Sequence, residues 1–390
     1  MAKNLVYLQS GGPTSVINTS LYGAMCEAAK HEEIGIFYGA HHGVEGLLND
    51  DLIDLARYSP KQLALLKQTP GAFLGSSRKK VSGDPEALSK VKQTLLARDI
   101  GYVLVNGGND SMDTCLALSS YLEGTGIRVV GVPKTIDNDL FGTDHCVGFP
   151  SACKHIMNTV ASIAIDASSY KKGKVTIVEV MGRDAGWLAA SASLLKGKAK
   201  PDMVLLPELK LDLRRFYRDL QRIYAKKGFA IIVVSEGLDF PKEEVSGTDS
   251  FGHVSPEGVS ITLAKMIKDE LGIGCRYSIL STPTRANPAL ISGVDSEEAF
   301  GVGQEAVKAA LAGESGVMIA LTPSREGKYV PGYSRVPVSE VANKVKAFPP
   351  EFLAYPNKPA KAFVSYLSPL LRGKVNVKYD SLGLIRFLSL

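Results

Sequence analysis

The chain has 390 residues, of which 45% are hydrophobic and 22% are charged, and this length suits two hydrophobic cores of ordinary size, so we expect two domains. Its formal charge of +5 is spread along the chain, which argues against nucleic acid and is compatible with a small polyanionic ligand. No apolar run approaches the roughly 18 residues of a membrane helix, so we expect no transmembrane segment and no membrane partner.

Short β-rich runs alternate with amphipathic stretches over most of the chain. Most of these runs are continuously apolar, which is typical of parallel strands that are covered on both faces. Asp84 followed by Pro85 marks the start of one helix, because Asp caps a helix N-terminus and Pro suits the first helical position. In chain order, the expected strands are residues 5–9, 36–40, 102–106, 128–132, 174–180, 203–207, 230–236, 276–280 and 317–321.

This alternation predicts the α/β fold class, with two doubly wound, mainly parallel sheets in separate domains. We expect the first domain in residues 1–150 and the second in residues 151–322. Residues 323–390 are richer in Pro, Tyr and basic residues, so we expect them to form an irregular C-terminal extension that packs on both domains.

The N-terminus and the cysteines both favour a cytoplasmic protein. The first residues, MAKNLVYLQSGG, contain too short an apolar stretch for a signal peptide, whose apolar region runs about 7–15 residues. The five cysteines are scattered, odd in number and never in CxxC spacing. They therefore predict reduced thiols, and neither a disulfide framework nor a zinc site.

Four loops that directly follow predicted strands carry glycine or charge where a ligand would meet the backbone. In parallel sheets ligands bind at the carboxyl ends of the strands, beside helix N-termini with unpaired N–H groups. Gly11, Gly12, Gly107 and Gly108 would let such N–H groups close on phosphate oxygens, although a double glycine is by itself most often only a turn. The four loops are residues 10–15, 107–111, 133–139 and 181–186.

The usual nucleotide and hydrolase motifs are absent from the sequence. It contains no GxxxxGK[ST], no HExxH and no GxSxG. The near match to GxGxxG at residues 301–306 follows polar residues and no strand, so we expect it inside a helix.

The segment PKTIDND is the most specific of the four loops. If its backbone is extended, the alternation of side chains places Asp137 and Asp139 on one side and Asn138 on the other. Two carboxylates that face one ligand can divide the work, one accepting a hydroxyl proton and the other orienting the hydroxyl or a metal. The competing interpretation is that both carboxylates cap the following helix.

Seven segments, in order, resemble the motifs of the phosphofructokinase family, and the resemblance covers most of the first 315 residues. It implies two Rossmann-like domains with the active site between them, and phosphoryl transfer to the 1-hydroxyl of fructose 6-phosphate. The matching segments are residues 10–18, 71–78, 107–111, 133–139, 178–183, 235–237 and 276–285.

The resemblance also implies roles for individual residues. Asp137 would be the general base, with Lys134, Thr135, Asp139 and Arg183 as the other catalytic residues. The donor would lie on Gly11, Gly12, Arg78, Gly107, Gly108, Asp110 and Ser111. The sugar phosphate would lie on Thr135, Asp137, Lys174, Met181, Gly182, Arg183, Glu236, Arg276, Thr282 and Arg285, the last of which would grip the 6-phosphate together with Arg276.

Family members take some phosphate ligands from a neighbouring subunit. A homodimer or homotetramer is therefore implied. Lys174 and Arg276 are the candidates for reaching across to the neighbouring subunit.

Two residues select the phosphoryl donor in this resemblance. Pyrophosphate-using members have Asp in the second glycine turn and Lys before TIDND, as this chain does with Asp110 and Lys134. A carboxylate at position 110 would repel the α-phosphate of ATP, at a cost of about 1 kcal/mol at 4 Å in water and more in a drier site. Lys134 would stabilise the leaving phosphate. We therefore predict pyrophosphate as donor, fructose 1,6-bisphosphate and phosphate as products, and a reversible reaction.

Three positions depart from the family pattern. Asn109 stands where an Asp associated with magnesium is usual, so Mg2+ would rely on pyrophosphate itself with Asn109 and Asp110 nearby. Ser281-Thr282 replaces Gly-His or Gly-Tyr, and Lys174 replaces Arg, which makes sedoheptulose 7-phosphate a plausible additional substrate. The alternatives to our prediction are an ATP-dependent 6-phosphofructokinase and a catalytically silent subunit that binds sugar phosphate.

Overall fold

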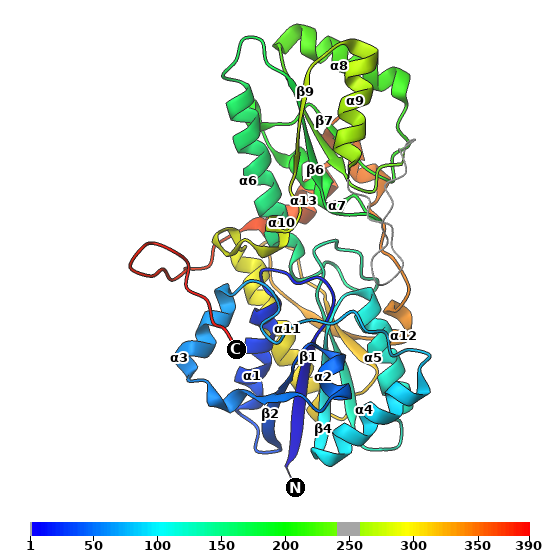
Figure 1. Ribbon diagram of the computed structural model, residues 1–390, viewed down its shortest axis with the longest axis vertical. Helices are drawn as coiled ribbons and strands as arrows, with labels where there is room; N and C mark the ends of the chain where they lie inside the picture. Colours follow the sequence, from blue (N-terminus) through cyan, green and yellow to red (C-terminus); the bar gives the residue numbers. More distant parts are fainter. Residues whose placement is uncertain (1, 240–257) are drawn as a thin grey trace. The chain divides into compact units, whose positions relative to one another are not determined.

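The computed structural model describes residues 2–239 and 258–390, and its internal contacts divide the chain into two compact units (Figure 1). The first unit comprises residues 1–151, 285–345 and 372–390. The second comprises residues 152–284 and 346–371. The chain therefore leaves the first unit twice and returns to it twice, so that each unit is built from separate segments of sequence.

A seven-stranded sheet forms the centre of the first unit, in the order β11-β10-β5-β4-β1-β2-β3. The five inner strands run parallel, and the two edge strands, β3 and β11, are antiparallel to their neighbours. The strands are β1 (Lys3–Gln9), β2 (Ile34–Ala40), β3 (Leu52–Asp54), β4 (Ile100–Gly107), β5 (Arg128–Pro133), β10 (Val317–Leu321) and β11 (Tyr333–Pro337).

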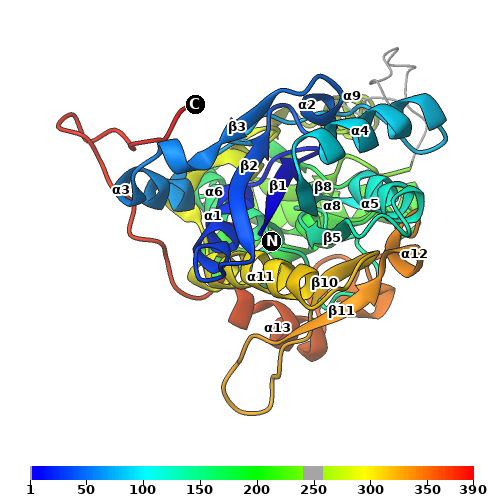
Figure 2. The same ribbon diagram turned by 90° about the horizontal axis from the view of Figure 1, so that it is seen from below.

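Helices cover both faces of this sheet, and Figure 2 shows α1 and α11 on one side of β1 and α2 and α4 on the other. Leu5 and Tyr7 of β1 pack into the core beneath α1 and α11, whereas Val6 and Leu8 pack into the opposite core. This division follows from the alternation of side chains along a strand, and it explains why β1 is apolar throughout. The helices are α1 (Ile17–Ala28), α2 (Val44–Leu48), α3 (Pro60–Leu63), α4 (Pro85–Ala97), α5 (Asn109–Tyr121), α11 (Gly293–Leu311) and α12 (Val338–Val341).

Two glycines set the close crossing of α1 and α11. A Cβ on Gly303 would lie 2.0 Å from the carbonyl oxygen of Ser20, and one on Gly23 would lie 2.0 Å from that of Phe300. The GxGxxG-like segment 301–306 is thus helix interior, as predicted, and Gly303 serves helix packing.

The second unit contains a four-stranded parallel sheet in the order β7-β8-β6-β9. Its core is formed mainly by the strands together with the apolar faces of α8 and α9. Asp212 caps α8 by accepting a hydrogen bond from the amide of Arg215, and α8 ends at Gly228 in a left-handed conformation. The strands are β6 (Val175–Val180), β7 (Met203–Leu205), β8 (Ala230–Ser235) and β9 (Cys275–Ile279), and the helices are α6 (Phe149–Ala167), α7 (Trp187–Ser191), α8 (Leu213–Lys227), α9 (Val259–Leu271), α10 (Pro283–Ala286) and α13 (Lys361–Leu367). Helix α6 begins at the end of the first unit, and α10 spans the boundary back to it.

The expected end of the second domain at residue 322 does not match the division of contacts. Residues 285–322 belong to the first unit, because α11 packs on α1 and β10 pairs with β5. The strand at 317–321 was predicted correctly, but its assignment to the second sheet was wrong. An apolar run shows that a strand is buried, whereas the sheet it joins depends on pairing with residues far away in the sequence.

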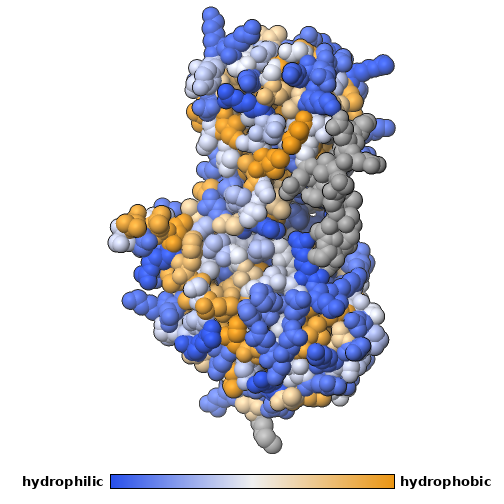
Figure 3. Space-filling model, viewed as in Figure 1, coloured by the Kyte–Doolittle hydropathy of each residue, from blue (hydrophilic) through white to orange (hydrophobic). Residues whose placement is uncertain are grey.

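The C-terminal region contains more regular structure than predicted. Residues 323–345 contribute β11 and α12 to the first unit, while residues 346–371 contribute α13 and an aromatic cluster around Trp187 to the second. Residues 372–390 return to the first unit, where the side chain of Gln68 binds the backbone of Lys378 and Arg386. Leu382 and Leu384 in this last segment are 81% and 61% exposed, and Figure 3 shows hydrophobic side chains at its surface.

Two further predictions concern the state of the cysteines and the absence of transmembrane helices. All five cysteines are free thiols in the structure. Within residues 2–239 and 258–390, no helix has both the length and the apolar character needed to cross a membrane.

Candidate active site

Three loops meet at the carboxyl ends of adjacent strands in the centre of the first sheet. β5, β4 and β1 are neighbours, and the loops that follow them are the three predicted phosphate or catalytic loops of this unit. The amide of Ser10 donates to the carbonyl of Asn106, and the amide of Lys134 donates to that of Gly107, so the three loops start in register. The chain turns to opposite sides after β1 and β4, which is where α/β sheets bind ligands.

Lys134 joins the first glycine turn to the loop that carries the two aspartates. Its Nζ donates to the carbonyl oxygens of Ser10 and Gly12 at 3.0 and 2.7 Å, and the residue is only 2% exposed. Burial and, second to it, the nearby Arg285 guanidinium lower the pKa of Lys134 to about 8, while Asp137 and Asp139 act in the opposite direction. The site therefore contains a cation at a fixed position, close to a second cation and two carboxylates.

Arg285 lies beside the first glycine turn. A Cβ on Gly12 would lie 2.5 Å from Nη1 of Arg285, so a side chain at this position would displace the guanidinium. The residue follows the second unit in sequence but belongs to the first. The resemblance placed Arg285 on the 6-phosphate of the sugar, and the structure places its guanidinium beside Gly12 and near Lys134.

The two glycines of the second turn have different roles. A Cβ on Gly107 would lie 1.9 Å from Oγ of Ser111, which is 1% exposed, so packing within the protein requires this glycine. Gly108 is the N-cap residue of α5. A Cβ on Gly108 would lie 3.5 Å from the carbonyl oxygen of Lys134, which is an ordinary contact. Its lack of a side chain thus leaves the helix N-terminus open to a ligand. Asp110 is exposed in the first turn of α5.

Asn109, the least expected residue of this turn, has a clear structural partner. Its Nδ2 donates to the carbonyl oxygen of Lys344 at 2.8 Å. An Asp in this place would set a carboxylate against a carbonyl and leave the carbonyl without a donor. Its Oδ1 is buried and has no hydrogen-bond partner within the described part of the chain. The amide therefore docks α5 on the 343–344 turn and keeps one oxygen available.

The backbone between Asp137 and Asp139 is not extended, so the alternation of side chains that an extended segment would give does not apply. Asn138 between them has a left-handed backbone with φ of 57°, and its buried side chain accepts a hydrogen bond from the amide of Cys146 at 2.9 Å. Asn adopts this conformation more readily than most residues, since its short polar side chain bonds locally. The competing helix-cap interpretation also fails, because α6 begins only at Phe149.

The first glycine turn is held by neighbours that the sequence did not single out. Ser76, two residues before the exposed Arg78, donates to the carbonyl of Gly11 at 2.7 Å. Behind it, the buried Asn18 donates to the carbonyls of Thr69 and Gly71 at 2.7 and 2.8 Å and accepts from the side chain of Gln9. The signal that would have indicated this anchor is an amide side chain shortly after the first glycine turn, because a buried amide needs hydrogen-bond partners.

In the second unit, the predicted sugar-binding segments form one corner at the ends of β6 and β8. The amide of Gly182 donates to Oε1 of Glu236 at 3.1 Å, and Ser235 donates to the carbonyl of Gly182. Gly182 needs its freedom because its φ is 117°. Arg183, one residue on, is one-third exposed and pairs with Asp184 at 3.2 Å. Residues 181–183 and Glu236 thus lie together at this corner.

The other predicted sugar ligands of this unit lie elsewhere on its sheet. Lys174 and Arg276 are exposed and line a groove of about 730 Å³ together with Tyr170 and Tyr277. Thr282 is exposed just before α10. β9 is an edge strand, and Tyr277 is 53% exposed. The unit thus presents two separate groups of predicted ligands.

Glu179, near the end of β6, was missed by the sequence analysis. It is 1% exposed and accepts hydrogen bonds from the amide and hydroxyl of Ser260 at 2.7 and 2.6 Å. A carboxylate is favoured at a helix N-terminus, so Glu179 anchors the start of α9 on the sheet.

Comparison with known proteins identifies the family of this chain. The family model described as Phosphofructokinase matches residues 4–310, which include all three loops of the first sheet and the corner at Gly182. The chain belongs to the phosphofructokinase family. Seven motifs in order had predicted this membership, and the comparison confirms it.

Among its relatives, the chain is 36% identical to a pyrophosphate–fructose 6-phosphate 1-phosphotransferase of Xanthomonas campestris pv. campestris, covering 99% of this chain and 96% of that protein. It is 30% identical to the ATP-dependent 6-phosphofructokinase 3 of Bacteroides thetaiotaomicron, covering 87% and 93%. A crystal structure of a pyrophosphate-dependent phosphofructokinase from Marinobacter aquaeolei matches with a TM-score of 0.89 at 33% identity, over 99% of this chain and 95% of that one. These matches confirm the predicted fold class.

Proposed function

We propose that this phosphofructokinase transfers a phosphoryl group from pyrophosphate to the 1-hydroxyl of fructose 6-phosphate, giving fructose 1,6-bisphosphate and phosphate. The observation that carries the proposal is the buried Lys134 ammonium, which is fixed at the junction of the first glycine turn and the aspartate loop. The names of relatives that share nearly the full length of the chain support the same donor.

Lys134 suits a leaving group that is phosphate alone. An ammonium has three donors, and the two carbonyls of Ser10 and Gly12 leave capacity for a phosphate oxygen. With Arg285 beside it, the positive charge is concentrated where the departing phosphate gains negative charge. Asp110 in the first turn of α5 places a carboxylate at the open helix N-terminus, where it disfavours a nucleotide with its additional phosphate.

Asp137 is the proposed general base. It accepts the proton of the 1-hydroxyl as the hydroxyl oxygen forms a bond to the transferred phosphorus, while the bond from that phosphorus to the bridging oxygen breaks. The electron pair of the broken bond stays on the leaving phosphate, which Lys134 stabilises. Both bonds exchanged are phosphate esters or anhydrides, so the same residues serve the reverse reaction.

Magnesium fits this site only as an ion that the substrate brings with it. Among residues 2–239 and 258–390, no three His, Cys, Asp or Glu side chains gather to hold a metal. The second turn nevertheless offers Oδ1 of Asn109 and the carboxylate of Asp110, and Mg2+ bound to phosphates needs only one or two protein oxygens. When bound, the ion would neutralise charge on the pyrophosphate oxygens.

For the sugar we propose Met181, Gly182, Arg183 and Glu236, whose arrangement supports contacts with hydroxyls and a phosphoryl group. Lys174 and Arg276 would complete the 6-phosphate site of a neighbouring subunit in a homodimer or homotetramer. Their exposure beside Tyr277 on an edge strand supports this role. Because Thr282 and Lys174 depart from the family pattern, sedoheptulose 7-phosphate is a further acceptor to test. The free thiols suit a cytoplasmic location.

The test is a matrix of donors and acceptors measured with purified protein and titrated Mg2+. We expect turnover with pyrophosphate and fructose 6-phosphate, in both directions. Turnover with ATP alone would overturn the proposal in favour of an ATP-dependent kinase. Binding of sugar phosphate without turnover by either donor would favour a silent subunit.

A further inference from the structure

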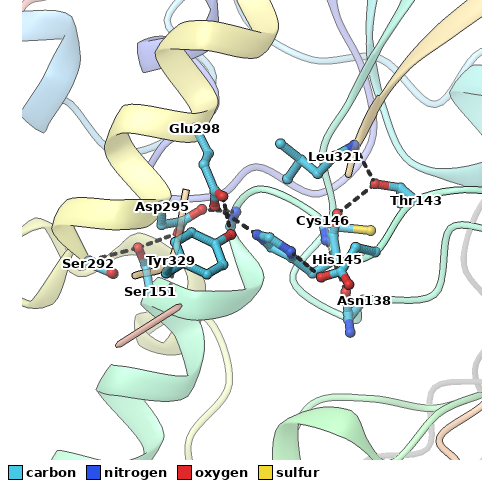
Figure 4. Close-up of polar contacts among 12 residues, drawn as sticks. Asn138, Thr143, His145, Cys146, Ser151, Ser292, Asp295, Glu298, Leu321 and Tyr329 are labelled. Atoms are coloured by element: carbon cyan, nitrogen blue, oxygen red, sulfur yellow. Dashed lines mark hydrogen bonds and ion pairs between the residues drawn. The ribbon is translucent and has the colours of Figure 1, made fainter. Parts of the chain in front are cut away.

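A buried ionic network lies beside the loop that carries Asp137 and Asp139, on the side of α11. His145 binds Oδ1 of Asp144 through Nδ1 at 2.9 Å and Oε2 of Glu298 through Nε2 at 2.7 Å (Figure 4). Tyr329 donates to the other oxygen of Glu298, and Arg325 makes two hydrogen bonds to Asp144, at 2.7 and 2.8 Å. His145 and Glu298 are both 0% exposed.

The geometry favours a doubly protonated imidazole. Each ring nitrogen of His145 faces a carboxylate oxygen, and only an imidazolium can donate to both. Burial alone would lower the pKa of His145, but Glu298 and Asp144 raise it to about 9. Two further charged groups lie nearby. Arg325 lowers the pKa of Asp144, against the effect of burial, and burial raises the pKa of Asp295 to about 6. The phenols of Tyr329 and Tyr333 lie close to Glu298. A buried cation held by this set is costly to disturb.

This network is connected to the catalytic loop through short hydrogen-bonded steps. Cys146, the residue after His145, donates its amide to Oδ1 of Asn138, which stands between the two aspartates. On the other side of His145, Thr143 accepts from the amide of Leu321 at 2.9 Å, and Asp144 donates its amide to the carbonyl of the same residue at 3.0 Å. Residues 134–148 contain no helix or strand, so these bonds substitute for regular structure.

Asp295 anchors the end of the same loop. It accepts hydrogen bonds from the amides of Gly148 and Ser151 at 2.8 and 3.1 Å, and its neighbour in the fold, Glu298, is one helical turn further along α11. Figure 4 shows both carboxylates on the side of α11 that faces the loop. The loop with the general base is thus supported by a helix that is separated from it in sequence by the whole second sheet.

We propose that protonated His145, paired with Glu298, is the positioning element of the catalytic loop: through the Cys146–Asn138 hydrogen bond it holds Asp137 and Asp139 where the proton is taken. His145 touches neither substrate in this scheme and acts only through the loop. The link to catalysis rests on the proposed function, whereas the support of the loop does not. Loss of the imidazolium charge should therefore affect turnover more than affinity.

The decisive variant is Glu298→Gln, which keeps the size and a hydrogen-bonding oxygen but removes the charge. Asp144 still raises the pKa of His145 in this variant, so that pKa should fall toward its ordinary value of about 6.5 and the imidazole should be neutral at pH 8. We expect kcat with pyrophosphate at pH 8 to fall about tenfold or more, a loss within the range for misplaced catalytic groups. The KM for fructose 6-phosphate should change little, and the deficit should shrink as the pH is lowered to about 6 because His145 recovers its proton.

Tyr329→Phe is the matched control. It removes one hydrogen bond to the same carboxylate but leaves the charges of His145 and Glu298 in place, so its kcat should retain the pH dependence of the parent protein. Hydrogen exchange of the 135–148 segment is a second readout that needs no turnover. At pH 8 we expect faster exchange in Glu298→Gln and in His145→Asn, and parent-like exchange in Tyr329→Phe.

The outcomes separate this inference from the proposed function. Parent-like kcat, pH profile and exchange in Glu298→Gln would overturn the positioning role. An equal loss at pH 6 and pH 8 would also overturn it, since the loss would then reflect general damage and not the charge on His145. A parent protein inactive with pyrophosphate would refute the proposed donor, while exchange of the loop would still test the support by His145. If Glu298→Gln does not fold, Glu298→Asp at the same position should preserve the pH profile, and failure to do so would count against the inference.

Discussion

Lys134 should make the reaction with pyrophosphate fall off above pH 8. Its pKa is lowered to about 8 by burial first and by Arg285 second, so about half of the free enzyme carries the ammonium at pH 8 and about a tenth at pH 9. Because kcat/KM reports ionisations of the free enzyme, kcat/KM for pyrophosphate should lose about tenfold per pH unit above that value. Bound pyrophosphate favours the charged form, so kcat itself should decline only at higher pH.

The same ionisation has a consequence for stability whose sign is opposite. The folded pKa of about 8 lies below the ordinary 10.5, so between these two values the unfolded chain binds more protons than the folded one. The free energy of unfolding contributed by this group should therefore rise from pH 8 to 10.5, by about 3 kcal/mol for a shift of this size. Below pH 8 both states are charged, and this contribution should not change.

Lys134→Met tests both consequences. Methionine has a similar length but no charge, so the variant should lose turnover with pyrophosphate and also lose the alkaline rise in stability measured by urea unfolding between pH 8 and 10. It leaves the carbonyls of Ser10 and Gly12 without their donor, which costs about 1–3 kcal/mol each when such groups are buried. A parent enzyme with constant kcat/KM from pH 7 to 9.5, or a Lys134→Met variant with parent-like turnover, would refute the reasoning.

Three further predictions follow from the same loops. Asp137→Asn should lower kcat by about 100-fold to 10,000-fold, as expected for loss of a general base, with unchanged thermal unfolding; a loss of less than tenfold in steady-state assays would exclude this role. Asn109→Asp should reduce the free energy of unfolding by about 1–3 kcal/mol in urea titrations, because a negatively charged oxygen replaces the donor to the Lys344 carbonyl. Equal or greater stability would show that the amide is dispensable. Asp110→Gly should permit turnover with ATP, and Asp110→Asn, which keeps the size without the charge, separates repulsion from steric exclusion; if neither variant binds ATP in calorimetry, position 110 does not select the donor.

Local sequence was sufficient to locate the parallel strands and the loops that follow them, but not the short antiparallel strands β3 and β11. Continuous apolar runs marked the parallel strands, and in a parallel sheet the residues after each run must lie at its carboxyl end. Gly11, Gly107, Lys134 and Asp137 were therefore predicted at one edge, and the structure places their loops on the adjacent strands β1, β4 and β5. The motif order also sufficed for the family, which the comparisons confirm.

Other features depended on residues distant in the sequence. Nothing in the segment 317–321 shows that it pairs with β5, and nothing near Arg285 shows that its guanidinium lies over Gly12. The backbone at Asn138 is left-handed and not extended, and its side chain accepts a hydrogen bond from the amide of Cys146, eight residues further along the chain. Periodicity describes the neighbours of a residue along the chain, and it carries no information on these contacts.

The sequence by itself determined which residue types stand at the strand ends, and hence the chemistry available to this protein: glycine turns for phosphates, a lysine, and two carboxylates. Only the tertiary structure decided how they are held. Lys134 is buried on two carbonyls, Asn109 donates to the backbone of Lys344, and the ring of His145 lies between the carboxylates of Asp144 and Glu298. The physical reason is that burial and charge pairing arise between segments that meet only after folding, and these two effects set protonation and position.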